Sequence, residues 1–317
     1  TTLTAPSQAN TKSETTGQKH ISTLVPDIKK LITDVSNGKP APITEENLNK
    51  FLDNVKESIL AWNKPTVKEK YQGKLRMSIL GKPPRQLWYD KNSPKETSED
   101  NSDMTLKFLY GHLIEHLILY LAELSGHKVE DQQKKVEVEG VTGHIDSKID
   151  GEICDVKSAS PFSFKKFQSG EIVNDDPFGY LAQLSGYETA MGTNQGGFLV
   201  VDKSSGDICF YKPDDMAKPN VKELISTLEK TLVSDTPPSK CYEDKTEKNG
   251  NKTLAVGCQF CIHKWECHSD SNNGKGLRVF KYANKNVFLT NIVKLPNVEE
   301  ITNQYKEQLE SYGKNKT

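Results

Sequence analysis

The chain has 317 residues, of which 34% are hydrophobic and 27% charged, enough for one elaborated domain or two small ones. Its 42 Lys and Arg residues nearly balance 43 Asp and Glu residues, so the formal net charge of −1 excludes a general electrostatic attraction to nucleic acid. Any such binding has to come from a local basic patch. The sequence shows no signal-peptide pattern and no apolar run of membrane-spanning length, so we expect a cytoplasmic protein that does not bind membranes.

The first part of the chain predicts a disordered tail followed by a helical cap. Residues 1–22 are rich in Thr, Ser, Lys and Asn, a composition typical of disorder. We expect a helix to begin near Thr44, with acidic residues in its first turn. The apolar residues on one face of this helix are Leu48, Phe51, Leu52, Val55 and Ile59. We assign residues 23–100 to this cap and to the segment that leads into the next part of the chain, and we expect a polar loop over residues 91–103.

A buried helix is predicted next, with Asp103 as its N-cap and Gly126 as its C-terminal stop. Apolar residues almost surround it, as is typical of a helix inside a core. Glu115 lies in the middle of this helix. A carboxylate there is costly unless it is paired or bound to a metal ion. Glu115 is therefore either a structural ion-pair partner or a metal ligand, and the pattern alone favours neither.

A β-hairpin is predicted around Asp150-Gly151, because Asp-Gly between two β-prone runs is the strongest short-range signal for a two-residue turn. With these residues as the turn, Asp146 lies directly opposite Asp155, with Cβ atoms roughly 4.5–5.5 Å apart. Lys157 shares a face with Asp155, and His144 lies opposite Lys157. The register thus gathers two carboxylates, an ammonium group and an imidazole.

This patch suits metal-dependent phosphodiester hydrolysis. The two carboxylates repel each other, and a divalent cation relieves the repulsion while taking carboxylate, water and phosphate oxygens as ligands. Lys157 can then orient or polarise the attacking water. The alternative is an ordinary exposed hairpin whose acids and lysine are solvated or paired with one another.

The segment Phe162-Ser163-Phe164-Lys165-Lys166-Phe167 combines aromatic rings with cations. Such a combination suits stacking on bases and binding of phosphates, with Phe164, Lys165 and Lys166 as the candidate residues. A loop that packs its own aromatic rings is the alternative.

Residues 177–188 look helical, which places Gln183 and Tyr187 on one face. In isolation, this pair is better explained by a tyrosine packed on the core with a glutamine at its rim. Further along, we expect a second hairpin over residues 196–212 that turns at 204–206, and a helix over residues 219–233. Residues 277–295 alternate like a strand pair, and residues 303–317 are polar and predict a fraying helix.

The chain has six cysteines, and four of them fall in one C-terminal segment, at Cys241, Cys258, Cys261 and Cys267. The Cys-x2-Cys pair followed by a third cysteine after five residues has the spacing of metal ligands. We therefore assign residues 236–317 to a cysteine-rich metal-binding segment and the C-terminal strands. The alternatives are reduced structural thiols and, less compatible with an intracellular setting, a disulfide framework.

Three motifs follow one another along the chain: Glu115 in a helix, Asp146 with Asp155-Val156-Lys157 in a hairpin, and Gln183-x-x-x-Tyr187 in a later helix. In this order they resemble the PD-(D/E)XK nuclease superfamily, and more closely the RecB-like and phage-encoded exonucleases that have the same Gln-to-Tyr spacing. The segment from Leu75 to Tyr89 also looks like the segment that precedes the catalytic core in these nucleases. One departure is Ile145, which stands where the superfamily pattern has proline before the first aspartate.

The resemblance implies a restriction-endonuclease-like α/β core over residues 101–235, with a mixed central sheet flanked by helices. It implies that Mg²⁺ or Mn²⁺ is bound by Glu115, Asp146, Asp155 and the carbonyl of Val156. Lys157 would position the nucleophilic water, and Gln183 and Tyr187 would support the site and the DNA strand. The candidate DNA-binding residues are Arg76, Arg85, Phe164, Lys165 and Lys166, and His144 is a candidate accessory residue.

The resemblance extends to the cysteines in part. In some RecB-like nucleases, a cysteine before the core joins a C-terminal Cys-x2-Cys-x5-Cys in holding a 4Fe–4S cluster. Here Lys82-Pro83-Pro84-Arg85 stands in the place of that upstream cysteine, which puts the fourth ligand in doubt. Cys241 is the candidate substitute, or else the site holds Zn²⁺, with His263 or His268 able to supply a nitrogen.

We therefore expect a metal-dependent deoxyribonuclease, an exonuclease that hydrolyses linear DNA from its ends in phage-type replication, recombination or DNA degradation. Its setting would be the cytoplasm of a bacterium or of a phage-infected host. A structure-specific or restriction-like endonuclease is one alternative, and a non-catalytic DNA-binding scaffold with a cysteine metal knuckle is another. The presence of all four of Glu115, Asp146, Asp155 and Lys157 argues against the scaffold. The resemblance also allows a homo-oligomer, or a partner involved in recombination or single-strand binding.

Overall fold

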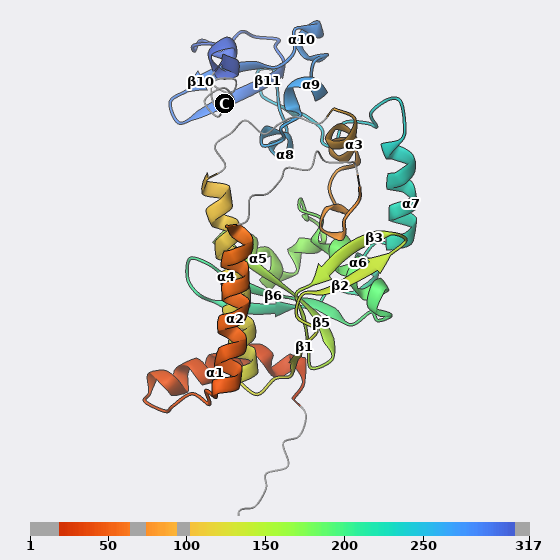
Figure 1. Ribbon diagram of the computed structural model, residues 1–317. Coiled ribbons are helices and arrows are strands. Elements are labelled where there is room, and N and C mark those ends of the chain that lie inside the picture. The colour runs from red at the N-terminus through yellow and green to blue at the C-terminus, as the bar shows by residue number, and fades with distance from the viewer. Residues whose placement is uncertain (1–18, 64–73, 94–101, 308–317) are drawn as a thin grey trace, which may run out of the picture.

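The computed structural model describes residues 19–63, 74–93 and 102–307, without the side chains of residues 102–105 (Figure 1). The tail predicted over residues 1–22 lies outside the described residues apart from residues 19–22, and so does the end of the chain from residue 308. None of the described helices has the length and the apolar character that a membrane crossing needs.

A five-stranded mixed sheet lies at the centre of the fold, in the order β1-β4-β5-β6-β7. Its strands are β1 (Val129–Glu130), β4 (Ser147–Ile149), β5 (Glu152–Ala159), β6 (Gly196–Asp202) and β7 (Ile208–Tyr211). β5 and β6 run parallel, while the other neighbours are antiparallel. The parallel pair needs a crossover connection, which the helices between β5 and β6 supply. The second hairpin is confirmed, because β6 and β7 pair across a turn that includes residues 204–206.

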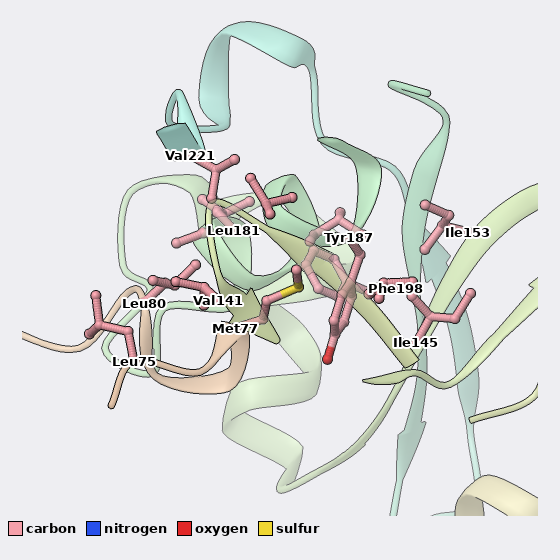
Figure 2. Close-up of a cluster of buried hydrophobic side chains, with 14 of the residues drawn as sticks. Leu75, Met77, Leu80, Val141, Ile145, Ile153, Leu181, Tyr187, Phe198 and Val221 are labelled. Carbon is pink, nitrogen blue, oxygen red and sulfur yellow. The ribbon is translucent and has the colours of Figure 1, made fainter. Parts of the chain in front are cut away.

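Helices cover both faces of this sheet. They are α1 (Leu24–Ser36), α4 (Ser102–Leu124), α5 (Pro161–Ser169), α6 (Tyr180–Met191) and α7 (Val221–Leu232). Ile153 and Phe198 pack with α5, α6 and α7 in one buried cluster, part of which Figure 2 shows. The next residues along the same strands, Cys154 and Leu199, pack with α1 and α4 in another. Successive strand residues therefore face different cores, as a strand's two-residue period requires.

This α/β arrangement confirms the predicted fold class and is consistent with a restriction-endonuclease-like core. The helices predicted over residues 103–126 and 219–233 correspond to α4 and α7. α4 begins one residue before the predicted N-cap Asp103, so that residue lies within the helix.

The N-terminal helices α1 and α2 (Glu45–Trp62) both pack on α4. The start of α2 is as predicted, since the hydroxyl of Thr44 accepts a hydrogen bond from the backbone N–H of Asn47 at 3.2 Å. Phe51 stacks on Tyr120 of α4 with ring centroids 4.8 Å apart. Leu52, on the predicted apolar face, remains 50% exposed, so only part of that face is covered by the described residues.

A separate two-stranded sheet consists of β2 (Lys134–Val138) and β3 (Val141–Ile145) and packs against α6 and the short 3-10 helix η2 (Met77–Ile79). In this sheet His144 pairs with Lys135 and is exposed. The prediction that His144 faces Lys157 is therefore wrong. The physical reason is that the chain leaves β4 at Asp146, whose side chain accepts the backbone N–H of Val156 in place of a strand partner.

The helix α3 (Pro84–Asn92) contacts α7 and so lies apart from α1 and α2, although the sequence grouped these segments together. The polar loop predicted from residue 91 begins at the end of α3, and residues 94–101 of it lie outside the described residues. Other 3-10 helices in the described part of the chain are η1 (Ile21–Thr23), η3 (Glu171–Val173) and η4 (Asp215–Ala217).

The C-terminal part forms a four-stranded sheet of its own, in the order β10-β11-β9-β8, which Figure 1 shows at the top, apart from the central sheet. Its elements are β8 (Lys245–Thr246), β9 (Lys252–Thr253), β10 (Arg278–Tyr282) and β11 (Lys285–Asn291), with the short helices α8 (Val256–Gln259), α9 (Lys264–Cys267) and α10 (Ser271–Gly274). The predicted strand pair over residues 277–295 is confirmed as β10 and β11. Residues 302–307 are helical, in line with the predicted terminal helix.

Candidate active site

The turn at Asp150 and Gly151 sets the register of the central hairpin. Both residues have positive φ angles, +52° and +91°, as a two-residue hairpin turn of this type requires. Ile149 pairs with Glu152, and the ladder continues outward as far as Ser147 and Cys154. The next residues outward are Asp146 and Asp155, so the predicted register is confirmed up to the point where the ladder ends.

Asp155 is buried in β5, with only 1% of its surface exposed. Its Oδ2 atom lies 2.5 Å from the Nζ atom of Lys157. Its Oδ1 atom is buried and has no hydrogen-bond partner among the described residues. Burial raises the pKa of Asp155, although the Lys157 ammonium opposes the shift. A buried carboxylate oxygen without a partner is costly to the fold, which points to a ligand.

Asp155 and Glu115 lie close enough to Asp146 to affect its ionisation. Burial, the charge of Asp155 and then the charge of Glu115 raise the pKa of Asp146 well above its ordinary value. Asp146 Oδ2 accepts the backbone N–H of Val156 at 2.7 Å. Glu115 is 7% exposed on α4, and its Oε1 atom accepts a hydrogen bond from Gln133 Nε2 at 2.7 Å. The structure thus brings the three predicted acids together from α4, the start of β4 and β5.

Gln133 bonds to one oxygen of Glu115, the Val156 backbone to one of Asp146 and Lys157 to one of Asp155. The other oxygen of Glu115 lies 3.9 Å from His112 Nδ1. The donor set is made of hard oxygens, which suits Mg²⁺ or Mn²⁺. Within the described residues, no group of three or more His, Cys, Asp or Glu side chains is already arranged so that it could hold a metal ion. Asp155 Oδ1 is the clearest position for a cation, because it is buried and unbonded.

Lys157 begins a series of hydrogen bonds that extends into the core. Its Nζ atom donates to Gln183 Oε1 at 3.1 Å, and Gln183 Nε2 donates to the Tyr187 hydroxyl at 2.8 Å. Tyr187 is 3% exposed, and Figure 2 shows it among the side chains of the core. Burial raises the pKa of Tyr187, so its hydroxyl stays neutral. Gln183 and Tyr187 therefore form the contact that their spacing allowed, with the glutamine oxygen aimed at Lys157.

Lys157 is a cation in this setting. Burial lowers its pKa, but the charges of Asp155 and Asp146 outweigh burial and raise the pKa overall. The ammonium group also lies 4.6 Å from the ring centroid of Tyr180, a cation–π contact.

A cleft of about 520 Å³ between α2 and α4 leads to Glu115. It is also lined by Gln133 and by Ser58 and His116, whose Oγ and Nε2 atoms lie 2.8 Å apart. The exposed rings at its rim are Trp62 and Phe108. Sequence reasoning did not single out Gln133, Ser58 or His116. The only local signal was that His116 follows Glu115 in a buried helix, and no spacing rule links Gln133 to that helix.

Residues 162–167 lie within the helix α5, so the predicted DNA-binding residues of this segment point in different directions around the helix axis. Phe164 is 4% exposed and packs in the core, so its prediction as a base-stacking residue is wrong. The helical period turns Phe164 and Phe167 inward and leaves Phe162 71% exposed. Lys165 is exposed, whereas Lys166 is ion-paired with Asp175 and lies over the Phe162 ring.

The two predicted arginines lie in different places. Arg76 is exposed next to β3, where its backbone bridges to Thr142. Arg85 instead points into the cysteine segment: its Nε atom donates to Cys267 Sγ at 3.0 Å, and its guanidinium also bonds to the carbonyl of Pro238. The sequence predicts that Arg85 contacts DNA, but in the structure its side chain is engaged with the C-terminal segment.

The four C-terminal cysteines line one small cavity, together with His263 and His268. Burial and the neighbouring thiols raise the pKa of Cys258 to about 12. His268 is 1% exposed, and neither of its ring nitrogens has a hydrogen-bond partner among the described residues. Clustered thiols beside an unbonded imidazole fit a soft or borderline metal ion. The structure therefore places Cys241 beside the same cavity as the other three cysteines.

Comparisons with known proteins give only distant likenesses. No family model matches the chain, and no curated protein matches it. Among solved structures, an alkaline exonuclease from Laribacter hongkongensis is similar at 15% identity and a TM-score of 0.36, over 56% of this chain and 94% of that chain. The protein SSO0001 is similar at 14% identity and a TM-score of 0.36, over 68% of this chain and 94% of that chain. At these values neither likeness assigns a family or an activity to this chain.

Proposed function

We propose that this protein is a metal-dependent deoxyribonuclease that hydrolyses DNA phosphodiester bonds. The observation that carries the proposal is the buried, unbonded Oδ1 atom of Asp155, whose carboxylate interacts electrostatically with Asp146, Glu115 and Lys157. Three mutually repelling carboxylates lower the stability of the fold unless a cation binds among them.

Glu115, Asp146 and Asp155 would hold Mg²⁺ or Mn²⁺, which would lower the pKa of a bound water and offset charge on the scissile phosphate. The Val156 backbone N–H fixes the orientation of Asp146, and its carbonyl is the further candidate ligand. Because Lys157 stays protonated, its role is to hold the water and the phosphate by charge and hydrogen bonding, not to remove a proton. Gln183, supported by Tyr187, keeps the lysine directed at that position.

Within this class we favour an exonuclease. The support is the Gln183–Tyr187 contact, which has the spacing of the RecB-like and phage exonucleases that the sequence resembles, and which directly contacts the catalytic lysine. The DNA-binding surface would use Arg76 and Lys165, which are exposed. The cysteine cavity would hold either Zn²⁺ or an iron–sulfur cluster, with Cys241 as the fourth thiol.

The test is incubation of the purified protein with linear duplex, single strands and covalently closed circles, in Mg²⁺ or in EDTA. We expect loss of linear DNA only with the metal, and intact circles. Nicked or linearised circles would move the assignment to an endonuclease. Binding without cleavage of any substrate, in Mg²⁺ and in Mn²⁺, would overturn the proposal in favour of a scaffold.

A further inference from the structure

One exposed aromatic ring stacks on the tyrosine whose ring contacts Lys157. Phe178 is 59% exposed, and its ring stacks on Tyr180 with centroids 5.4 Å apart and planes 29° apart. The Tyr180 ring in turn lies 4.6 Å from Lys157 Nζ. A single ring therefore separates Phe178 from the ammonium group of the candidate active site.

The backbone that carries Phe178 is held firmly. The carboxylate of Asp176 accepts the N–H groups of Tyr180 at 3.0 Å and Leu181 at 2.9 Å, which caps the start of α6. Gly179, with a φ of +75°, packs so tightly against Gly81 that a Cβ atom would lie 2.2 Å from the Gly81 Cα atom. Only glycine fits this approach, so the turn is fixed from two sides.

The ring stack is also supported from within. Tyr180 contacts Phe167 and Phe198 of the core, with centroid distances of 5.9 Å and 6.4 Å. The Tyr180 ring therefore lies between the core rings and Phe178. Because Tyr180 fills that space, the Phe178 ring stays at the surface. Single exposed apolar residues are common on proteins, so exposure alone means little. The rigid turn and the adjacency to Lys157 are what distinguish Phe178.

From this geometry we infer that Phe178 is a stacking subsite for an unpaired base of the nucleotide next to the scissile phosphate. Rings of this kind bind bases of single strands, because an unpaired base offers a free π face, whereas a base in a duplex is already stacked between its neighbours. The inference rests on the proposed nuclease function, and it adds that the protein selects single-stranded or frayed DNA at the point of cleavage.

The test uses the full chain carrying Asp155→Asn, which we expect to bind DNA without cutting it, and single strands with 2-aminopurine at successive positions from the end. The emission of this base falls when it stacks. We expect strong quenching at one position, its loss in Phe178→Ala, and its return in Phe178→Trp. Affinity for the single strand should fall about 5- to 100-fold in Phe178→Ala. Tyr282→Ala removes a similarly exposed ring from the C-terminal hairpin and should leave both values unchanged.

A cleavage assay without the Asp155 change gives a second readout. Phe178→Ala should lower the ratio of single-strand to duplex cleavage by a similar factor. Unchanged quenching and an unchanged ratio in Phe178→Ala would overturn the subsite even if the parent is an active nuclease. Lack of cleavage by the parent in Mg²⁺ and Mn²⁺ would instead reject the nuclease function, and the quenching data would still decide whether Phe178 stacks on bases.

Discussion

The carboxylate site and the cysteine cavity both gather side chains from distant parts of the sequence, but they rest on different supports. Asp155 lies on β5 between two large buried clusters, and its neighbours Glu115 and Asp146 are each held by a hydrogen bond. The cysteines lie on short helices and loops over a small cluster that includes Cys258 itself.

This difference separates two uses of a metal ion. The central sheet has two large apolar clusters that hold it together, so a cation at Asp155 would offset the repulsion among the carboxylates and would serve mainly the chemistry. The C-terminal segment has little apolar area to stabilise it, so a metal bound by its thiols would contribute directly to folding, as in small zinc domains. The predictions below test this contrast, beginning with the largest expected effect.

Asp155→Asn should lower the turnover number by about 10³-fold or more, because it removes the charged oxygen that the cation needs. The measurement is single-turnover cleavage of end-labelled DNA in Mg²⁺. Asp207→Asn is the matched control, since Asp207 is an exposed carboxylate paired with Lys29 on the surface. If both variants kept the parent's turnover, the carboxylate site would be wrongly placed.

Cys258→Ser should cost the C-terminal segment about 5 kcal/mol or more of unfolding free energy, through loss of its metal. Calorimetry and metal analysis of the purified protein would show a lost transition together with a lost ion. Cys209→Ser, in the central sheet, should change neither, because that thiol lies outside the cavity. A parent protein that carries no bound metal would remove the structural role assigned to the cysteine cavity.

Gln183→Leu should lower the turnover number by about 10- to 100-fold with a small effect on KM, because Lys157 loses the oxygen that orients it. The charge of Lys157 remains, so the loss should be smaller than for Asp155→Asn. His144→Ala should have no effect, since His144 is exposed on a different sheet. Steady-state kinetics on the same single strand would separate the two, and equal losses in both variants would contradict the geometry.

Ionisation of Asp146 should destabilise the metal-free protein as pH rises above the ordinary carboxyl pKa of 3.8, a contribution that appears as the difference in unfolding free energy between the parent and Asp146→Asn. The folded pKa of Asp146 lies above the unfolded one, so between them the folded state binds more protons and stability falls with rising pH. Asp146→Asn should therefore raise the unfolding free energy at neutral pH by about 1 kcal/mol or more, a gain that disappears toward low pH.

Urea titrations at several pH values would measure this slope. Mg²⁺ should restore stability to the parent above that pH range and have less effect on Asp146→Asn. If the advantage of Asp146→Asn over the parent did not grow as pH rises, Asp146 would not be repelled by its neighbours.

The hairpin shows how far local signals reach. Asp150-Gly151 fixed the register through the positive φ angles that its turn needs, and this placed Asp146 next to Asp155 without any long-range knowledge. The same counting failed one step further out. Counting along a continuous strand places His144 opposite Lys157. The ladder instead ends at Asp146, whose side chain accepts the backbone N–H of Val156, and His144 pairs with Lys135 in another sheet.

The helix α5 shows a second limit. The sequence predicts that its aromatic and basic residues bind bases and phosphates. The helical period instead decides which rings can be buried together, and only the sheet beneath α5 decides which face turns inward. The exposed ring of Phe178 stacks on Tyr180, which contacts Lys157, and no sequence pattern singled it out.

The sequence by itself determined the α/β class, the hairpin register, the acids and lysine of the site, the Gln183–Tyr187 pair and the cysteine cluster. These depend on period, turn chemistry and spacing, which act over a few residues. Only the tertiary structure decided that Gln133 holds Glu115, that Arg85 turns toward Cys267 and that Cys241 joins the other three thiols. Such contacts join residues far apart in the chain, and their geometry follows from how whole helices and sheets pack together.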